Sequence, residues 1–299
     1  NQSLKFLPTV LIYLLLSFSA YASGGGVSLV SDEIKRIGVF PITNSMVTSW
    51  VVSIFIIIFI KLLVGKTSLV PTKGQLVLES AVNILRGITE PIVGRKVFYP
   101  SFWLLSGLFI FILIQNLSAL LPGVGTIGYG YDDGGHFVVE KPLVRPANAD
   151  LNMTLALALV ANICWVYFIV KYAGFKAIMK DWFGNKADKK QVPFLVFGLL
   201  GILFIAVGLI EVLSILFRPI SLTFRLFGNV YGGESLLHSM FYLGDKLGLS
   251  GNWINFLMTV APIPFYFMEV LIGIVQALVF MLLVSVYIGL ICNHEEEHH

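Results

Sequence analysis

The longest apolar stretch of the chain, residues 194–243, reads FLVFGLLGILFIAVGLIEVLSILFRPISLTFRLFGNVYGGESLLHSMFYL. A helix needs about 20 apolar residues to cross a bilayer, so this stretch is far longer than a perpendicular crossing requires. A second long apolar stretch, residues 253–291, follows a short loop at 244–252. The lengths predict two long helices, tilted or broken, that pack antiparallel as a hairpin within residues 192–292.

Three shorter stretches nearer the N-terminus are also apolar enough to cross a membrane, and their uncharged cores are residues 46–60, 102–121 and 151–170. Residues 75–98 instead alternate apolar and polar side chains at helical spacing, which is typical of a helix lying on a membrane surface. The sequence therefore predicts an all-α integral membrane protein with about five membrane-embedded helices and one interfacial amphipathic helix.

The composition excludes several classes of protein. The chain of 299 residues is 57% hydrophobic and 12% charged, whereas soluble domains carry roughly 25% charged residues. These values exclude a disordered chain, a coiled coil and an ordinary soluble enzyme. The 20 lysines and arginines are sparse and unevenly placed, so the sequence shows no nucleic-acid footprint.

The sequence contains no motif for nucleotide binding or nucleophilic catalysis. Cys164 and Cys292 lie within or at the end of apolar runs, without the spacing of a disulfide framework or a metal site, and we interpret them as buried thiols. The histidines and glutamates of residues 294–299 fit a solvated tail better than a metal site, because nothing orients them as ligands. We expect no metal, no cofactor and no ATP chemistry on this chain.

Residues 1–22 are typical of a secretory leader, with Lys5, an apolar run at 6–18 and a small-x-small pattern at 20–22. An uncleaved first helix is the alternative interpretation. We expect residues 23–299 to form a single polytopic membrane domain.

The cationic residues predict the orientation of the chain in the membrane. Six lie in residues 61–96 and six in 171–190, against two in 23–44, two in 122–150 and one in 244–252. Cytoplasmic loops of membrane proteins contain the excess of lysine and arginine. The mature N-terminus is therefore predicted outside and the C-terminus in the cytoplasm. The leader favours a bacterial plasma (inner) membrane over a thylakoid membrane.

Five charged residues remain within the predicted spans, namely Glu211, Arg218, Arg225, Glu234 and Glu269. An arginine at bilayer depth costs about 2.5–3.5 kcal/mol on insertion scales, so such groups need a partner, a water-filled cavity or a function. For Arg218, snorkelling to the headgroups is the alternative. The two long helices are therefore the candidate ion path.

A step of about 100° per residue divides the polar side chains of the helix that contains Arg225 between two faces. The residues on the face of Arg225 are Glu211, Arg218, Ser221, Gly228, Asn229 and Gly232. The two glycines would let another helix approach closely. Glu234 and His238 fall on the opposite face, where a hydrogen-bonded packing role is the alternative for the histidine.

The last helix adds two polar residues that point to the same side, because Gln276 follows Glu269 by close to two helical turns. Antiparallel packing of the two long helices is expected to bring Glu269 near Glu234 and Gln276 near Arg225.

The run from Arg218 to Glu234, RPISLTFRLFGNVYGGE, resembles the signature of subunit a of the rotary F-type ATP synthases. Residues 269–289, with QALVF at 276–280, resemble the last helix of that family. Asn116-Leu117 and the LLPG of residues 120–123 resemble its segment at the end of the second span. The resemblance covers most of the chain from the first span onward and is most specific around Arg225.

The resemblance implies a proton-translocating stator subunit of the Fo sector, beside a rotating ring of c subunits. Two offset half-channels would lead to the ring, Arg225 would face the ring carboxylates, and Glu234 and Glu269 would line the outer half-channel. The further positions that it implies near the arginine or the channels are Ser221, Asn229, Gln276, Glu211 and Asn116. Some family members have a histidine where Glu269 stands, and this chain has His238 instead, so we include that residue.

The implied partners are the c-subunit ring, the b-subunit peripheral stalk, the other F1Fo subunits and membrane lipid, without nucleic acid. The chain would couple ion flow to ring rotation and ATP synthesis without catalysing ATP chemistry itself. A stand-alone ion-coupled secondary transporter is the alternative, but it would show repeated halves with interrupted helices, and this sequence contains no such repeat. In a third class, a structural scaffold, neutral substitutions at Glu234 and Glu269 would change assembly and not ion flux.

Overall fold

The computed structural model describes residues 31–65, 71–121, 124, 127–133, 136–172, 174, 194–241, 243 and 260–292. The predicted leader, the loop at 244–252, the tail at 294–299 and most of residues 171–190 lie outside these ranges. The chain forms two compact units. The first unit consists of Asn1–Gly65, Ile110–Thr154 and Phe224–Leu278, and the second of Lys66–Phe109, Leu155–Thr223 and Val279–His299.

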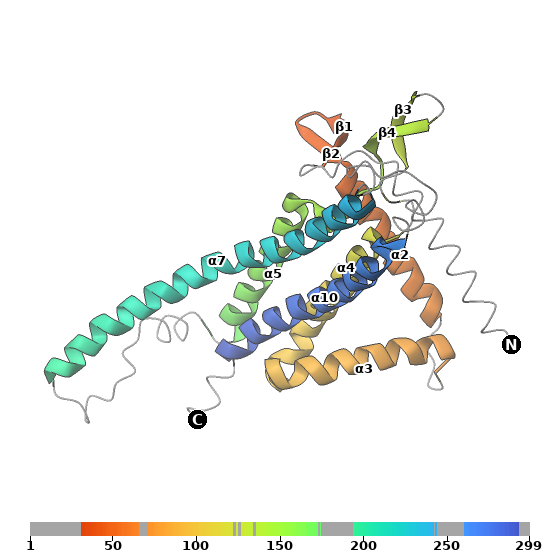
Figure 1. The fold of residues 1–299 in the computed structure, drawn as a ribbon. Helices are drawn as coiled ribbons and strands as arrows, with labels where there is room; N and C mark the ends of the chain where they lie inside the picture. The colour runs from red at the N-terminus through yellow and green to blue at the C-terminus, as the bar shows by residue number, and fades with distance from the viewer. Residues whose placement is uncertain are drawn as a thin grey trace. The chain divides into compact units, whose positions relative to one another are not determined.

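Helices make up most of the described chain (Figure 1). They are α2 (Asn44–Val64), α3 (Lys73–Val93), α4 (Arg95–Ala119), α5 (Leu151–Tyr172), α7 (Phe194–Phe241) and α10 (Pro262–Cys292), with a short 3₁₀ turn, η1 (Ala147–Ala149). Among the described residues, five helices are long and apolar enough to cross a membrane: α2, α4, α5, α7 and α10. The predicted all-α membrane fold is confirmed, with α3 as the additional amphipathic helix.

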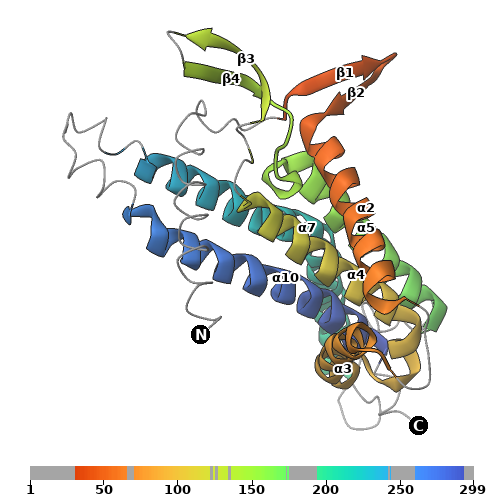
Figure 2. The ribbon, with the colours of Figure 1, turned by 90° about the vertical axis from the view of Figure 1, so that its right-hand side faces the viewer.

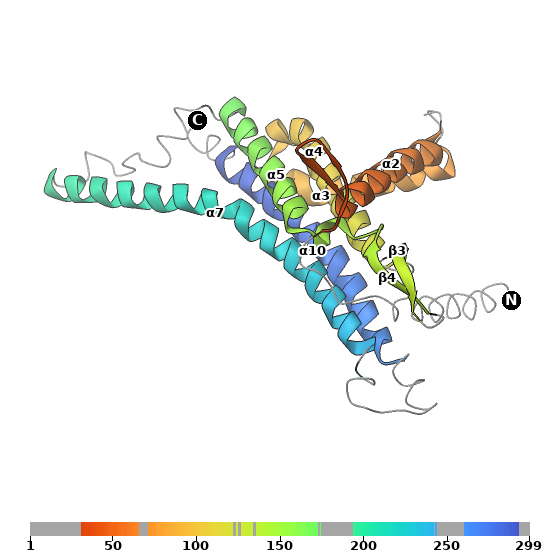
Figure 3. The same ribbon diagram turned by 90° about the horizontal axis from the view of Figure 1, so that it is seen from above.

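The two longest spans are α7 and α10, as the apolar stretches predict. The 48 residues of α7 continue through Pro219 without interruption, and α10 has 31 residues. Within the first unit, residues 224–241 of α7 lie alongside residues 262–278 of α10 and run in the opposite direction (Figures 2 and 3). This part of the predicted hairpin is therefore antiparallel.

Capping and glycine set the bounds of α3. The side chain of Thr72 accepts a hydrogen bond from the backbone N–H of Gln75 and caps the start of the helix. The helix ends at Val93 because Gly94 has a φ of +83°, in the left-handed region that favours glycine. The predicted segment 75–98 thus contains all of α3 except its first two residues, the break at Gly94 and the first turn of α4.

Two β-hairpins lie near each other in the first unit (Figure 2). β1 (Glu33–Ile37) pairs antiparallel with β2 (Phe40–Thr43), and β3 (Gly128–Asp133) pairs antiparallel with β4 (His136–Pro142). The sequence does not predict β3 and β4, because residues 122–150 are rich in Gly, Pro and Asp, a composition that is typical of loops.

Buried polar contacts join the start of α2 to the segment that follows β4. The Asp150 carboxylate accepts hydrogen bonds of 2.6 Å from the hydroxyls of Ser31 and Ser45. The Asn44 side chain donates to the carbonyl of Pro142 at 2.9 Å. Since buried polar groups are stabilised only when they are paired, these bonds fix residues 142–150 in the first unit.

In the second unit, the C-terminal part of α10 contacts both α3 and α5. Gly289 lies against the backbone carbonyl of Ile92 in α3, where a side chain would overlap it. The indole N–H of Trp165 in α5 donates to the carbonyl oxygen of Tyr287 at 2.7 Å. Glycine thus permits one close backbone approach, and a hydrogen bond fixes the other contact.

Candidate functional site

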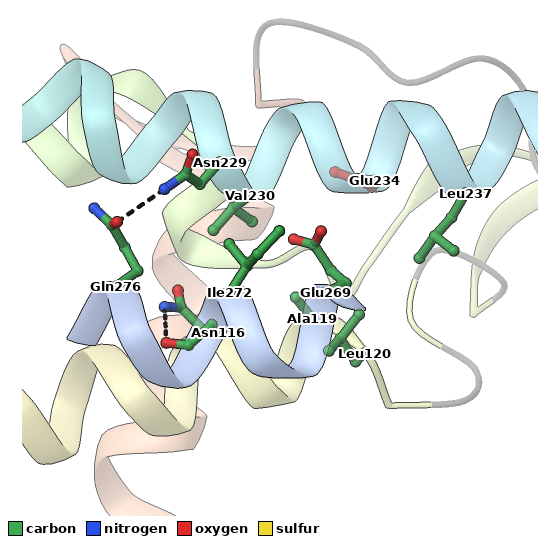
Figure 4. A pocket seen from close by; sticks show the side chains of 11 residues that line it. Asn116, Ala119, Leu120, Asn229, Val230, Glu234, Leu237, Glu269, Ile272 and Gln276 are labelled. Carbon is green, nitrogen blue, oxygen red and sulfur yellow. Dashed lines mark hydrogen bonds between the residues drawn. The ribbon is translucent and has the colours of Figure 1, made fainter. Parts of the chain in front are cut away.

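A pocket lies between α4, α7 and α10 within the first unit (Figure 4). It contains about 410 Å³ of space, part of which is open to the outside. The residues that line it are Asn116, Ala119, Leu120, Asn229, Val230, Glu234, Leu237, Glu269, Ile272, Gly273 and Gln276. All five polar side chains among them are sites that the sequence analysis proposed.

The two acidic residues of the pocket approach each other from facing helices, as the antiparallel packing predicts. The Glu269 carboxylate points from α10 toward α7 (Figure 4) and lies against Gly233, where even a methyl group would overlap it. Glu234 is the next residue of α7, and its Oε2 atom is buried without a hydrogen-bond partner among the described residues. Such a carboxylate oxygen requires water or another polar partner.

An amide pair joins α7 to α10 two turns away from Glu269. The Asn229 side chain donates to Oε1 of Gln276 at 2.8 Å, and the Nε2 atom of Gln276 is buried without a partner in the described part of the chain. We expected Gln276 near Arg225, and its hydrogen-bond partner is Asn229, which follows Arg225 by about one helical turn. Asn229 also lines the pocket.

Polar side chains of α4 and of the segment before α5 form a second hydrogen-bonded group at the pocket. Asn116 accepts a hydrogen bond of 2.7 Å from Asn148 and donates one of 3.0 Å to the carbonyl of Gly273 in α10. The neighbouring Gln115 is fully buried, and neither of its side-chain polar atoms has a partner among the described residues. Polar atoms therefore continue from the pocket into the interior of the first unit.

Arg225 lies on an open face of α7, away from the pocket. Its side chain is exposed, and no described residue forms a hydrogen bond or an ion pair with it. A Cβ atom added at Gly228 or Gly232 would meet nothing within 4 Å. In the first unit this face of α7 is thus free to receive another helix. Ser221, which belongs to the second unit, is also exposed.

Arg218 is held inside the second unit. Its guanidinium pairs with the Glu211 carboxylate at 2.8 Å, and its side chain is 10% exposed. Its Cζ atom lies 4.3 Å from the ring centroid of Tyr287 and 4.8 Å from that of Trp165. Snorkelling to the headgroups, the alternative for this residue, does not occur in this arrangement. His238 is half-buried and is not one of the pocket residues.

The sequence is similar to characterised proteins over most of its length. A family model described as ATP synthase A chain matches residues 46–289. The chain belongs to the ATP synthase A chain family. Relatives named ATP synthase subunit a include those of Moorella thermoacetica, 30% identical over 86% of this chain and 94% of the relative, and of Gloeobacter violaceus, 28% identical over 86% of each. ATP synthase subunit a 2 of Bradyrhizobium sp. is 29% identical over 87% of this chain and 94% of that protein.

This member of the ATP synthase A chain family has two buried residues near the pocket that the sequence analysis did not select. Asn148 contacts Asn116, and Arg145 is 5% exposed, donates to the carbonyl of Ala149 and acts electrostatically on Glu234. Both belong to the segment between β4 and α5, and nothing in the sequence indicates that this arginine is buried. Among the described residues, no cluster of three His, Cys, Asp or Glu side chains could hold a metal ion.

Proposed function

We propose that this multi-pass membrane protein is the stator subunit of the Fo motor that faces the c-ring and provides two offset half-channels for protons. Membership in the ATP synthase A chain family supports a proton-translocating role in Fo. The observation that carries the finer proposal is the exposed Arg225, which pairs with none of the described residues and lies on an open, glycine-containing face of α7.

Arg225 would control the charge of the ring carboxylates. A protonated carboxylic acid can travel through lipid, whereas an ionised one is expensive there. An arginine stays positively charged and stabilises a carboxylate that comes near it. The ring carboxylate would therefore release its proton to one half-channel at Arg225 and take up a proton from the other. Each proton that crosses the membrane contributes about 2.3 kcal/mol per 100 mV.

The pocket with Glu234 and Glu269 supports an outer half-channel that contains water. A water molecule inside a protein needs two to four polar partners. The unpartnered atoms Glu234 Oε2 and Gln276 Nε2 belong to residues that line the pocket. Protons would pass along such water between the two carboxylates and the amides of Asn229 and Asn116.

The same proposal gives Glu211, which precedes Arg225 in α7, a place in the inner half-channel. The side chain of Glu211 is 41% exposed, so one of its oxygens can exchange protons with water while the other pairs with Arg218. The expected orientation, with the mature N-terminus outside a bacterial plasma membrane and the C-terminus in the cytoplasm, is part of the proposal. The proposal also includes the c-ring and the b-subunit stalk as partners.

The uninterrupted α7 and α10 weigh against a stand-alone secondary transporter, which would place its ion site at broken helices. In the described residues, neither helix is broken near its charged side chains. These observations therefore favour a stator subunit that acts together with a second protein.

The decisive experiment replaces Arg225 by alanine in the complex assembled with its partner subunits in membrane vesicles. We expect ATP-driven proton pumping, followed with a pH-sensitive dye, to fall roughly a hundredfold, because an unpaired charge at bilayer depth costs about 2.5–3.5 kcal/mol. Arg36→Ala is the control, since Arg36 is an exposed arginine of β1 that pairs with Glu33. Pumping by Arg225→Ala at the level of the control would refute the proposal.

A further inference from the structure

The strongest polar cluster outside the pocket surrounds Arg218 in the second unit. The arginine comes from α7, Trp165 from α5 and Tyr287 from α10. Both ring centroids lie within the roughly 6 Å over which a guanidinium is attracted to an aromatic face. The Trp165 N–H also donates to the backbone carbonyl of Tyr287, which fixes the Trp165 ring relative to the backbone of α10. We call Trp165 and Tyr287 the aromatic clamp.

Among the described residues, Arg218 pairs with one acidic side chain. Its Nη2 atom lies 2.8 Å from Oε1 of Glu211, two helical turns earlier in α7. The arginine side chain is 10% exposed and the glutamate side chain is 41% exposed. The cation is therefore held in the protein, while the carboxylate that it pairs with reaches the surface of the second unit.

A guanidinium is not needed at this position for packing alone. Replacing a buried ion pair by apolar side chains of similar volume is often neutral or stabilising. Arginine is suited instead to hold a carboxylate in a fixed orientation, because its planar donors are rigid and stack on aromatic rings. Lysine would keep the charge and lose this geometry.

We infer that Arg218, held by the Trp165–Tyr287 clamp, is a positioning residue that fixes the Glu211 carboxylate as a proton relay beside the ring. The inference rests on the proposed function, in which Glu211 belongs to the inner half-channel. A water molecule that has received a proton from the ring transfers it to the exposed Glu211 oxygen. The resulting acid then gives the proton to a water molecule on the inner side and becomes a carboxylate again. Arg218 stays protonated throughout.

Replacing Tyr287 of the aromatic clamp tests this inference, because the charges of Arg218 and Glu211 stay in place. We compare Tyr287→Leu with the matched control Tyr287→Phe, which keeps the ring and the backbone carbonyl that accepts from Trp165. Proton pumping and passive proton conduction are measured in vesicles and divided by the amount of assembled complex. We expect Tyr287→Leu and Arg218→Gln to lower both fluxes about tenfold, Arg218→Lys to recover only part of the loss, and Tyr287→Phe to remain close to wild type.

A double-mutant cycle separates positioning from a packing role. In a Glu211→Gln background, Tyr287→Leu should have no further effect on flux, because the relay is already absent. Additive losses, or wild-type flux per complex in Tyr287→Leu and Arg218→Gln, would overturn the inference. Wild-type flux in Glu211→Gln would overturn it too. If Arg218→Gln does not assemble, Tyr287→Leu and the cycle still decide the question.

The Arg225→Ala variant keeps this test distinct from that of the proposed function. If Arg225→Ala stops pumping while the clamp variants pump normally, only the role of Arg218 is wrong. If Arg225→Ala pumps normally, the proposed function fails, whatever the clamp variants do.

Discussion

Arg218 and Arg225 stand seven residues apart in α7 and have different surroundings. Arg218 pairs with Glu211 between two aromatic rings, whereas Arg225 has no hydrogen bond or ion pair within the described ranges of the chain. An arginine with an acidic partner of its own stays with that partner. One without such a partner is available to an acid on another protein. This contrast underlies the assignment of ring contact to Arg225 and positioning to Arg218.

At the scale of single residues, Gly233 offers a test of the pocket. An alanine Cβ at this position would overlap the Glu269 carboxylate, which is the end of a flexible side chain and can move. We therefore expect Gly233→Ala to keep the fold and assembly but to lower proton pumping about tenfold. A displacement of a reacting group by about 1 Å can lower a transfer rate strongly even where the packing changes little.

The control for this prediction is Gly107→Ala in α4, where an added Cβ meets nothing within 4 Å. Alanine at an exposed helical position stabilises a helix by about 1 kcal/mol relative to glycine, so this variant should assemble and pump normally. Equal pumping by Gly233→Ala and Gly107→Ala would show that the position of the Glu269 carboxylate does not limit proton flow.

At the scale of helices, the contact of α10 with α3 differs from its contact with α7, because a backbone atom limits it. An alanine at Gly289 would overlap the carbonyl oxygen of Ile92, which cannot rotate away. We expect Gly289→Ala to separate the two helices and to cost about 1–3 kcal/mol, as overpacking does. The measurement is the thermal unfolding midpoint of the purified complex, which should fall.

Gly273→Ala is the matched glycine in the same helix, since its Cβ would lie 3.2 Å from the Cβ of Asn116 and needs a shift of only a few tenths of an ångström. A midpoint for Gly289→Ala that is no lower than that for Gly273→Ala would mean that the α3–α10 contact adapts to the extra methyl group.

The sequence predicts the helices well and the strands poorly, for physical reasons. Uncharged apolar stretches identify α2, α4, α5, α7 and α10, because burial in lipid requires length and apolarity and little else. The break at Gly94 needs a backbone angle that periodicity does not reveal. The strands β3, GYGYDD, and β4, HFVVEKP, lack a regular alternation of apolar and polar side chains, so the sequence pattern does not predict them.

For the whole molecule, the same reasoning explains which parts of the site were predicted. Helical spacing and antiparallel packing were enough to bring Glu234 and Glu269 to one pocket. They were not enough for Asn148, which reaches Asn116 across 32 residues of sequence through a loop and a hairpin. Nor did they anticipate that Trp165 and Tyr287, on two other helices, would enclose Arg218.

The orientation of the whole chain gives a prediction that does not depend on the pocket. The excess of lysine and arginine in residues 61–96 predicts that this region lies in the cytoplasm and that the β1–β2 turn lies outside, because only α2 separates the two. After Cys164 and Cys292 are changed to serine, single cysteines replace Val39, which is 96% exposed, and Lys73, which is also exposed. A membrane-impermeant thiol reagent should label Val39→Cys in right-side-out vesicles and Lys73→Cys in inverted ones. Labelling of both positions from the same side would mean that α2 does not cross the membrane. The reverse pattern would mean that the chain has the opposite orientation, so that the proposed half-channels would open to the opposite sides.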